Sequence, residues 1–473
     1  MGTEIKKKEQ TMMCAEELKL NNVRNKKLNS KETRKTSGIT LIALVVTIVV
    51  LLILAGITIS LVFSENGIIA KAKEAAEKTN QAVINEQEQM NEAGITIDNM
   101  LNGTGGSEEE PTPPESTLPS DGSYSEEKGL NTPKLGSGMT PIKWNGSSWV
   151  ETNGSDKEWY DYTAKKWANA KTSDGSMWVW IPRYAYSITS GYHSSSAGNI
   201  DVEFMKGLTN ETSTGKKSFD NVSGQGKWNI HPAFNYGQTV SGIWVAKFEA
   251  SNSSGKIKVE PGVSSWKSIT INDIYTNCLN YNKTLNSHMM KNDEWGAVAY
   301  LSKSKYGKNA EVDINDDSSY YTGGGSGNAY VNNVGQSTTG TVHGVYDMSG
   351  GAYEYVAAYV NNGNSSLSNG ESLVNGDAKT KNVYSKGSSD DRDSNYSANS
   401  GKYGDAVYET SVNGNSSNSS WYGDDSYFPD TNSPFFLRGA FYGAGTSGGV
   451  FYFDYEDGNS FNTYSFRPVL VVL

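Results

Sequence analysis

Residues 344–355 read GVYDMSGGAYEY and place a small turn, Asp-Met-Ser-Gly-Gly, between two aromatic flanks. Tight turns favour Asp, Ser and Gly, so this segment predicts a hairpin. Upstream lies HMMKNDEWGAVAY (288–300), and downstream lie LRG (437–439) and SFRPVL (465–470). The upstream stretch predicts a helix over about 291–304, because Trp295, Val298 and Leu301 recur on one side at helical spacing.

The serial order of these four stretches resembles the formylglycine-generating enzyme and sulfatase-modifying-factor family. The resemblance covers roughly residues 140–473 and implies a C-type-lectin-like α+β domain whose C-terminal strand ends inside the domain. Independently of it, short apolar runs such as WVWIPRY (178–184) and GIWVAKF (242–248) predict short strands between long polar loops. A second helix is predicted over about 271–281.

The catalysis of that family requires a reactive cysteine between the Arg-Gly turn and the closing strand, and residues 438–473 contain none. The two cysteines of the chain are Cys14, in a basic leader, and Cys278, in an amphipathic stretch that predicts a buried, inert thiol. The four histidines are far apart in sequence, and no metal-protease, nucleophile-elbow or phosphate-loop pattern occurs. We therefore expect no enzymatic activity, with a different chemistry on the same fold as the alternative.

The candidate binding surface is the stretch AFYGAGTSGGVFYFDYEDGNSFNTYS (440–465), which mixes aromatic and acidic residues with Gly, Ser, Thr and Asn. This is the composition of a paratope. In relatives that are targets of diversity-generating retroelements, the corresponding stretch is the variable, ligand-contacting region, and the resemblance implies the same role here. Val450, Phe451 and Phe453 are expected to include core positions. The predicted ligand-binding residues are Phe441, Tyr442, Tyr452, Asp454, Tyr455, Asp457, Asn459, Phe461, Asn462 and Tyr464.

Other notable residues have structural interpretations. Four tryptophans that lie inside apolar runs are predicted to be core residues: Trp178, Trp180, Trp244 and Trp295. Arg438 and Arg467 are expected to tie loop carbonyls or carboxylates together. Two acidic loops, DINDD (313–317) and DRDSN (391–395), have alternating oxygen ligands but lack the glycine and distant glutamate of an EF-hand. Calcium stays possible at either loop, and a solvated acidic loop is the alternative; no other cofactor is expected.

Residues 39–63, ITLIALVVTIVVLLILAGITISLVF, are 25 residues without a charge. A helix of this length, at about 1.5 Å per residue, crosses a hydrocarbon core of roughly 30 Å. Ten Lys or Arg residues precede it, so residues 1–38 are predicted to be a basic cytoplasmic leader and the C-terminal part extracellular. The helix is predicted to continue to about residue 93. A secretory signal peptide is the alternative, although the segment is long and lacks an Ala-x-Ala-like site.

The junction KTSG-ITLI (35–42) resembles the leader of type IV pilin-like proteins. The resemblance implies cleavage by a prepilin-type peptidase between Gly38 and Ile39. The fifth mature position, acidic in that family and paired with a neighbouring subunit's amino terminus, is Ala43 here, which counts against filament assembly. A plain single-span anchor that keeps its leader is the alternative.

Residues 94–139 are predicted to be a flexible linker, because the Pro, Glu, Gly and Ser within it cannot bury enough surface to offset chain entropy. The net charge of −11 argues against nucleic acid as a partner. The sequence therefore predicts a single-span cell-membrane protein with a C-type-lectin-like ectodomain over 140–473. Its expected function is non-catalytic adhesion or recognition of an extracellular protein or glycan. The alternative is a structural or minor pilin subunit of a pilus-associated filament or secretion system.

Overall fold

The computed structural model describes residues 120–473, and the chain there is α+β, as the sequence predicts. The predicted leader (1–38), the membrane segment (39–63, continuing to about 93) and the Gly38-Ile39 cleavage site lie outside the described residues. Among residues 120–473, no helix has the length and apolar character needed to span a bilayer.

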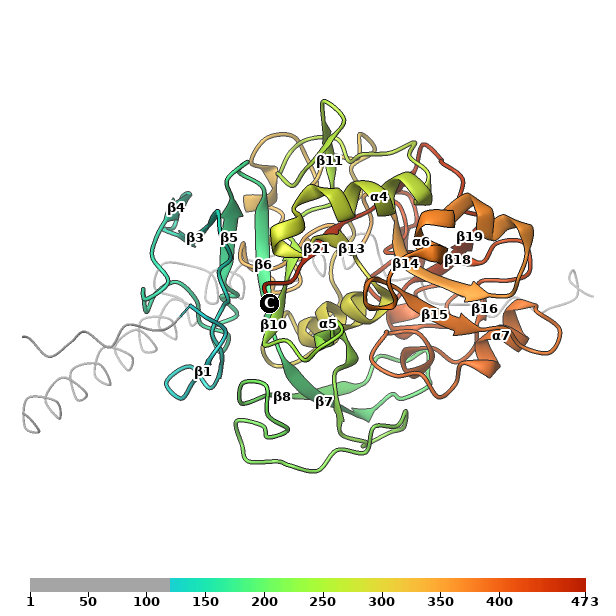
Figure 1. The fold of residues 1–473 in the computed structure, drawn as a ribbon, viewed down its shortest axis with the longest axis horizontal. Helices are drawn as coiled ribbons and strands as arrows, with labels where there is room; N and C mark the ends of the chain where they lie inside the picture. Colours follow the sequence, from blue (N-terminus) through green and yellow to red (C-terminus); the bar gives the residue numbers. More distant parts are fainter. Residues whose placement is uncertain (1–119) are drawn as a thin grey trace, which may run out of the picture. The chain divides into compact units, whose positions relative to one another are not determined.

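The first of two large sheets is built around strand β6 (Met177–Pro182), all six residues of which are buried. A continuous apolar run is the pattern expected of such a fully buried strand. The C-terminal strand β21 (Pro468–Leu470) lies inside this sheet, as the family resemblance implies, and Figure 1 shows it in red beside the green strands. Across the sheet the order is β13 (His288–Met289), β21, β10 (Gly242–Ala246), β6, β5 (Asn169–Thr172), β3 (Met139–Trp144) and β4 (Trp149–Glu151).

The second large sheet is built around β14 (Tyr353–Asn361), which begins within the GVYDMSGGAYEY segment. The predicted hairpin is wrong, because residues 344–352 form an irregular, bent segment and the strands that pair with β14 come from other segments. β14 pairs antiparallel with β18 (Phe435–Arg438) and parallel with both β15 (Asn382–Ser385) and β20 (Tyr464–Ser465). From β18 the sheet continues through β19, β17 and β16, drawn in orange and red in Figure 1. Their bounds are β19 Phe453–Glu456, β17 Ser426–Tyr427 and β16 Asn415–Ser416.

Smaller elements surround these sheets. The predicted helices are confirmed as α4 (Ile271–Tyr281) and α5 (Asn292–Lys303). Two short helices, α6 (Glu371–Asn375) and α7 (Arg392–Ala398), follow. The remaining strands are β7 (Tyr184–Ser190), β8 (Asn199–Phe204) and β9 (Asn229–Ile230) in one sheet, and the hairpins β1 (Tyr124–Ser125) with β2 (Leu130–Asn131) and β11 (Ser251–Ser253) with β12 (Lys256–Lys258). The 3-10 turns are Pro232–Phe234, Lys283–Leu285, Ala329–Val331, Val334–Gln336, Ser365–Gly370, Ala378–Thr380, Tyr408–Thr410, Trp421–Gly423 and Gly445–Ser447.

Helix α5 is buried on all sides, which is the pattern of a central helix. Its Trp295 indole donates a hydrogen bond of 2.8 Å to the Val450 carbonyl, and the guanidinium groups of Arg438 and Arg467 lie 5.4 and 5.9 Å from its ring. At Gly296 a side chain would overlap the Gly404 carbonyl, so only glycine allows this close packing. The stretches 437–439 and 465–470 therefore meet around Trp295, and the stretch 344–355 is joined to them through the hydrogen bond from Arg467 to Glu354.

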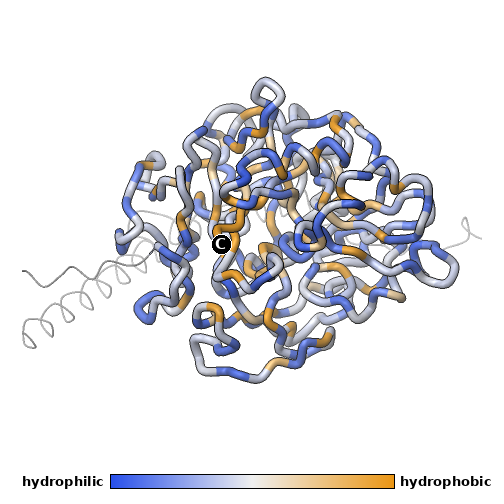
Figure 2. Tube along the Cα trace, in the orientation of Figure 1, coloured by the Kyte–Doolittle hydropathy of each residue, from blue (hydrophilic) through white to orange (hydrophobic). Residues whose placement is uncertain are grey.

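The predicted core is confirmed: Trp178, Trp180, Trp244 and Trp295 are at most 1% exposed. Figure 2 shows apolar segments gathered along the inner strands and hydrophilic segments in the outer loops. The predicted role of Arg438 is also confirmed, because its guanidinium donates to the carbonyls of Asp405 (3.1 Å) and Ala406 (3.0 Å).

The predicted linker boundary is wrong, because residues 120–139 belong to the folded part. The Asn131 side chain is buried and donates to the carbonyls of Gly207 and Ser241 at 3.2 and 3.0 Å. In return, the core indoles of Trp180 and Trp244 donate to the carbonyls of Asn131 and Lys134. This segment is held by the buried side chains of Leu130 and Asn131 and by backbone acceptors, and it contains too few apolar residues for its composition to indicate folding.

Candidate functional site

The candidate site forms where three separate segments meet beside the start of β14. The Tyr442 amide donates to the Gly351 carbonyl, and the Tyr353 amide donates to the Thr463 carbonyl, both at 2.9 Å. The Gly350 amide donates to the Gly439 carbonyl at the same distance. These backbone bonds fix the predicted stretch 440–465 against the 350–353 turn.

Aromatic rings from these segments form a connected row, which we call the aromatic face. The Phe441 and Tyr353 rings are stacked, with centroids 5.3 Å apart and an angle of 24°. Tyr464 lies edge-on to Tyr353 at 5.7 Å, and Phe461 lies 5.3 Å beyond Tyr464. Phe461 is 56% exposed, so this end of the row reaches the protein surface. The aromatic face consists of Tyr320, Tyr353, Phe441, Tyr442, Phe461 and Tyr464.

Carboxylates on β19 border this row. Asp454 and Glu456 are two residues apart and so share one face of the strand. Asp454 accepts a hydrogen bond of 2.5 Å from the Tyr452 hydroxyl, and Glu456 accepts one from the Tyr464 hydroxyl. Burial raises the pKa of Tyr353 to about 12, and the charges of Asp454 and Glu456 add to that shift. The aromatic face is therefore acidic, which favours ligands that present cations or hydrogen-bond donors.

The turn that leads into the aromatic face is strained. Gly439 has a φ of 80° and Ala440 a φ of 62°, both in the left-handed region that suits glycine. Strain of this kind persists only where the surroundings impose it, so the conformation of Phe441 and Tyr442 is set by the fold.

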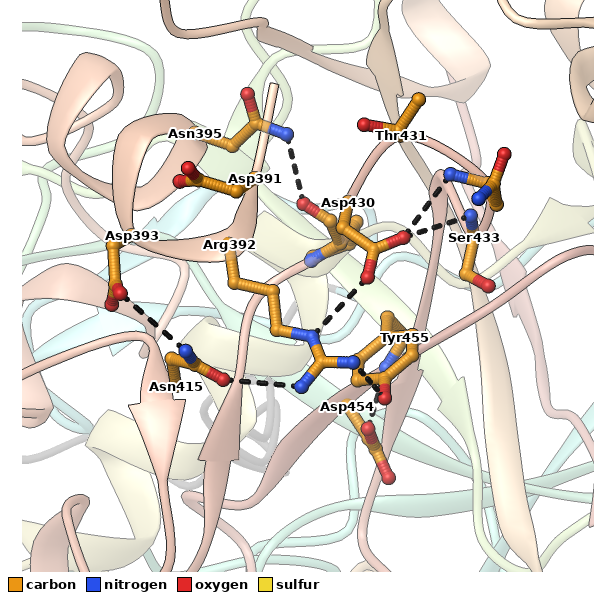
Figure 3. A network of polar contacts seen from close by, with 12 residues as sticks. Asp391, Arg392, Asp393, Asn395, Asn415, Asp430, Thr431, Ser433, Asp454 and Tyr455 are labelled. Atoms are coloured by element: carbon orange, nitrogen blue, oxygen red, sulfur yellow. Dashed lines mark hydrogen bonds and ion pairs between the residues drawn. The ribbon is translucent and has the colours of Figure 1, made fainter. Parts of the chain in front are cut away.

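Tyr455 does not belong to the aromatic face. It projects from the other side of β19, where the Arg392 guanidinium stacks on its ring at 3.8 Å and donates to its hydroxyl. Arg392 also forms an ion pair with Asp430 at 3.3 Å and donates to Asn415 at 3.1 Å, as Figure 3 shows. Arg392 thus joins α7 to strands β19 and β16 of the second sheet and to the loop that carries Asp430.

The Arg392→Ala variant is expected to lose about 1–2 kcal/mol of unfolding free energy, because it loses a stacking contact and three polar contacts at a partly exposed site. Arg392→Lys should recover only part of this loss, since an ammonium cannot form the planar fork. Denaturant unfolding measures both, with Lys227→Ala, from an exposed ion pair with Asp220, as the control. An Arg392→Ala protein as stable as wild type would contradict the structural role.

The other predicted contact residues fall into two groups. Phe461, Asn459 and Asn462 are exposed, and Phe441, Tyr442, Asp454, Asp457 and Tyr464 are half-buried. Tyr452 was predicted to lie on the surface, but it is 5% exposed, because its ring packs 5.8 Å from Tyr353. The expectation that Val450, Phe451 and Phe453 include core positions is confirmed, since all three are buried.

Sequence reasoning missed three contributors to this surface. Tyr353 lies at its centre, whereas the sequence indicates only that it belongs to the GVYDMSGGAYEY segment. Glu456 lies within the predicted stretch 440–465. Its position two residues after Asp454 on a strand places both carboxylates on the same face, and this spacing is a signal that could have identified it. Tyr320 comes from a distant loop, with its ring 4.9 Å from Tyr442, and no local pattern identifies it.

The two acidic loops use their oxygens internally. Asp391 caps α7 by accepting from the Ser394 amide, and the Asn395 amide group donates to Asp390 and to the Pro429 carbonyl. In the other loop, Asp313 forms an ion pair with Lys308 at 2.6 Å. Among the described residues, no group of three or more His, Cys, Asp or Glu side chains is placed to hold a metal ion.

Cys278, the cysteine among residues 120–473, is fully buried in α4. Burial raises the pKa of the Cys278 thiol well above its usual value, which keeps it protonated and unreactive. The sequence had predicted such a buried thiol, and its burial is confirmed.

Comparison with known proteins adds no assignment. No protein-family model matches the chain. No curated protein matches its sequence either.

Proposed function

We propose that the protein is a non-catalytic receptor or adhesin of the cell surface, whose aromatic face binds an extracellular ligand. The observation that carries this proposal is the convergence of exposed and half-buried rings with the carboxylates of Asp454 and Glu456 on one strained, fixed framework. Rigid aromatic rings supply contact area at low entropic cost.

The ligand class that best suits this face is a protein surface or glycan that presents basic or hydroxyl groups. Carboxylates beside ring faces attract ammonium and guanidinium groups through both charge and cation–π interaction. Lys267 already occupies such a position over the Tyr320 ring, with its Nζ 3.9 Å from the centroid. A basic side chain of a ligand would make the same contact at the neighbouring rings.

The C-type-lectin-like fold is part of the proposal. Its support is that the stretches 437–439 and 465–470 meet around Trp295 of the stretch 288–300, that Arg467 joins them to Glu354 of the stretch 344–355, and that the C-terminal strand lies inside a sheet. Display on a membrane helix, with or without cleavage at Gly38-Ile39, rests on the sequence alone. The alternative, a pilin-like subunit, would be eliminated if filaments are unchanged when this protein is absent.

The test is binding of soluble residues 112–473, which form a separate unit, to intact bacterial and host cells and to a glycan panel. We expect saturable binding to at least one of these. No binding to any cell or glycan would contradict the proposal.

Binding is expected to weaken by about three- to tenfold between pH 7.5 and pH 5, the effect of removing one charge near a cationic ligand group. Burial raises the pKa of Asp454 to about 6, so its carboxylate is lost in this range. Because the folded pKa lies above the unfolded value of 3.8, the contribution of this group to stability is larger at low pH, and unfolding curves at both pH values separate weaker binding from unfolding. The Asp454→Asn variant should bind with little dependence on pH, whereas an unchanged pH profile would remove Asp454 from the binding surface.

A further inference from the structure

A cleft of about 520 Å³ lies beside the edge of the first sheet, in segments that contribute nothing to the aromatic face. Strands β3 and β4 form one wall, and a loop around the 3-10 turn Ala329–Val331 forms another. A cavity of this size falls in the usual range of small-molecule sites, roughly 300–1,000 Å³. The residues that matter for its chemistry are Trp144, Trp149, Lys171, Glu260, Tyr330 and Asn332.

Two tryptophans form the apolar part of the cleft. Trp144 and Trp149 are directly opposite each other in the β3–β4 hairpin, and so their side chains share one face of the sheet. Their rings lie edge to face, with centroids 5.6 Å apart and an angle of 65°. The connecting loop is fixed by the Asn145 side chain, which accepts hydrogen bonds from the amides of Ser147 (3.0 Å) and Ser148 (2.9 Å). The tryptophan pair is therefore preorganised.

Trp149 is also held by buried groups. The ammonium of Lys247 lies 4.9 Å from its ring centroid, and the His343 ring lies 5.5 Å away, edge-on. Lys247 cannot move, because it is buried and donates to the carbonyls of Val342 (2.7 Å) and Gly344 (2.9 Å). Within residues 120–473 the Nε1–H of Trp149 is buried and makes no hydrogen bond of good geometry. Burial raises the pKa of the nearby Tyr330 hydroxyl, and the proximity of the Trp149 indole opposes part of that rise.

The polar lining is mixed and balanced in charge. Lys171 supplies donors, Glu260 supplies acceptors, and Asn332 supplies both. In the described part of the chain, neither Lys171 nor Glu260 forms an ion pair. One charge of each sign gives no preference for an anion or a cation, so the lining suits a neutral ligand rich in hydroxyl groups.

We propose that this cleft binds a neutral carbohydrate, of one or two pyranose rings, stacked on the Trp144 indole. The C–H bonds on one face of a pyranose are weakly positive and pack well on the negative face of an aromatic ring. Its hydroxyl groups each donate and accept, which matches the combination of ammonium, carboxylate and amide around the rim. The protein then carries two binding surfaces of different chemistry: an acidic aromatic face and a neutral tryptophan cleft.

The test is a titration of residues 112–473 with neutral mono- and disaccharides of glucose, galactose and N-acetylglucosamine, followed by calorimetry and ligand-observed NMR. We expect saturable binding of at least one sugar below about 10 mM, the weak end of specific recognition. Trp144→Ala should weaken it about tenfold or more, as for a central aromatic contact, and Trp144→Phe less. Trp228→Ala, which removes a half-buried indole outside the cleft, is the matched control.

Two further variants keep the test decisive if Trp144→Ala disturbs the hairpin. Lys171→Met and Glu260→Gln alter half-exposed side chains at the rim, and each should weaken sugar binding about threefold or more through lost hydrogen bonds. Absence of binding to every sugar tested would overturn the proposal. So would binding that Trp144→Ala, Lys171→Met and Glu260→Gln leave unchanged. Because these residues lie outside the aromatic face, this outcome is independent of cell binding.

Discussion

The Arg467→Met variant is expected to lose about 3–5 kcal/mol of unfolding free energy, the cost of leaving a buried charge without its partner. Arg467 is fully buried and donates to Glu354 through Nε, with 2.8 Å to Oε2, and through Nη2. It also donates to the carbonyls of Ala246 and Tyr346, each at 3.0 Å. One side chain therefore joins the closing strand to both large sheets and to the turn below the aromatic face.

The loss of unfolding free energy in Arg467→Met should be larger at pH 8 than at pH 5. Burial raises the pKa of Glu354 to about 7, above its unfolded value of 4.5, so its contribution to stability falls as pH rises between these values. The Arg467 guanidinium lowers the pKa of Glu354, so removing Arg467 lets the pKa of Glu354 in the folded protein increase further. Protonation at pH 5 therefore relieves part of the damage.

Denaturant unfolding at both pH values measures this effect. Arg467→Met/Glu354→Gln should regain part of the loss, because the uncompensated carboxylate is gone. Lys227→Met, at an exposed ion pair, is the control and should change stability by less than about 0.5 kcal/mol. An Arg467→Met protein with wild-type stability at pH 8 would show that this buried pair does not hold the fold.

The second large effect is expected in binding. Replacing Tyr442 and Phe461 together by Ala should weaken binding to the responsive cells about 100-fold or more, because aromatic anchors dominate interface energies. Phe461 is mostly exposed and Tyr442 half-buried, so neither substitution removes a fully buried core side chain. Tyr452 and Tyr455 are poor targets by comparison, since one is buried and the other is stacked under Arg392.

The matched control for this pair is Leu208→Ala with Val222→Ala, which removes two exposed apolar side chains elsewhere on the surface. Unfolding curves of all variants separate lost binding from lost folding. If the Tyr442/Phe461 variant binds as tightly as the Leu208/Val222 control, ligand contact does not occur at the aromatic face.

Local patterns predicted a good part of this fold. The apolar spacing of α4 and α5 gave their bounds to within about a residue or two, and the apolar runs around Trp180 and Trp244 gave two central strands. Sheet order could not be predicted in the same way. β21 pairs with β10, and β14 with β20, across long stretches of chain, and such pairing depends on packing rather than on local propensity.

The candidate site was predicted in position but not in detail. Alternation along β19 correctly separated Phe453 from Asp454, because a strand alternates its faces. It failed for Tyr452 and Tyr455, since the residues that cover them, Tyr353 and Arg392, come from distant segments. Burial by a non-local partner leaves no trace in a local sequence pattern.

The most direct test of the binding claim is hydrogen exchange of residues 112–473, free and with a ligand that the cell or glycan panel identifies and whose binding Trp144→Ala leaves unchanged. The account predicts slower exchange at the amides of 350–353, 440–442 and 461–465, which form the aromatic face. Segments 144–149 and 328–332, around the tryptophan cleft, should be unchanged by this ligand. Protection confined to other segments, with none at the aromatic face, would contradict the central claim.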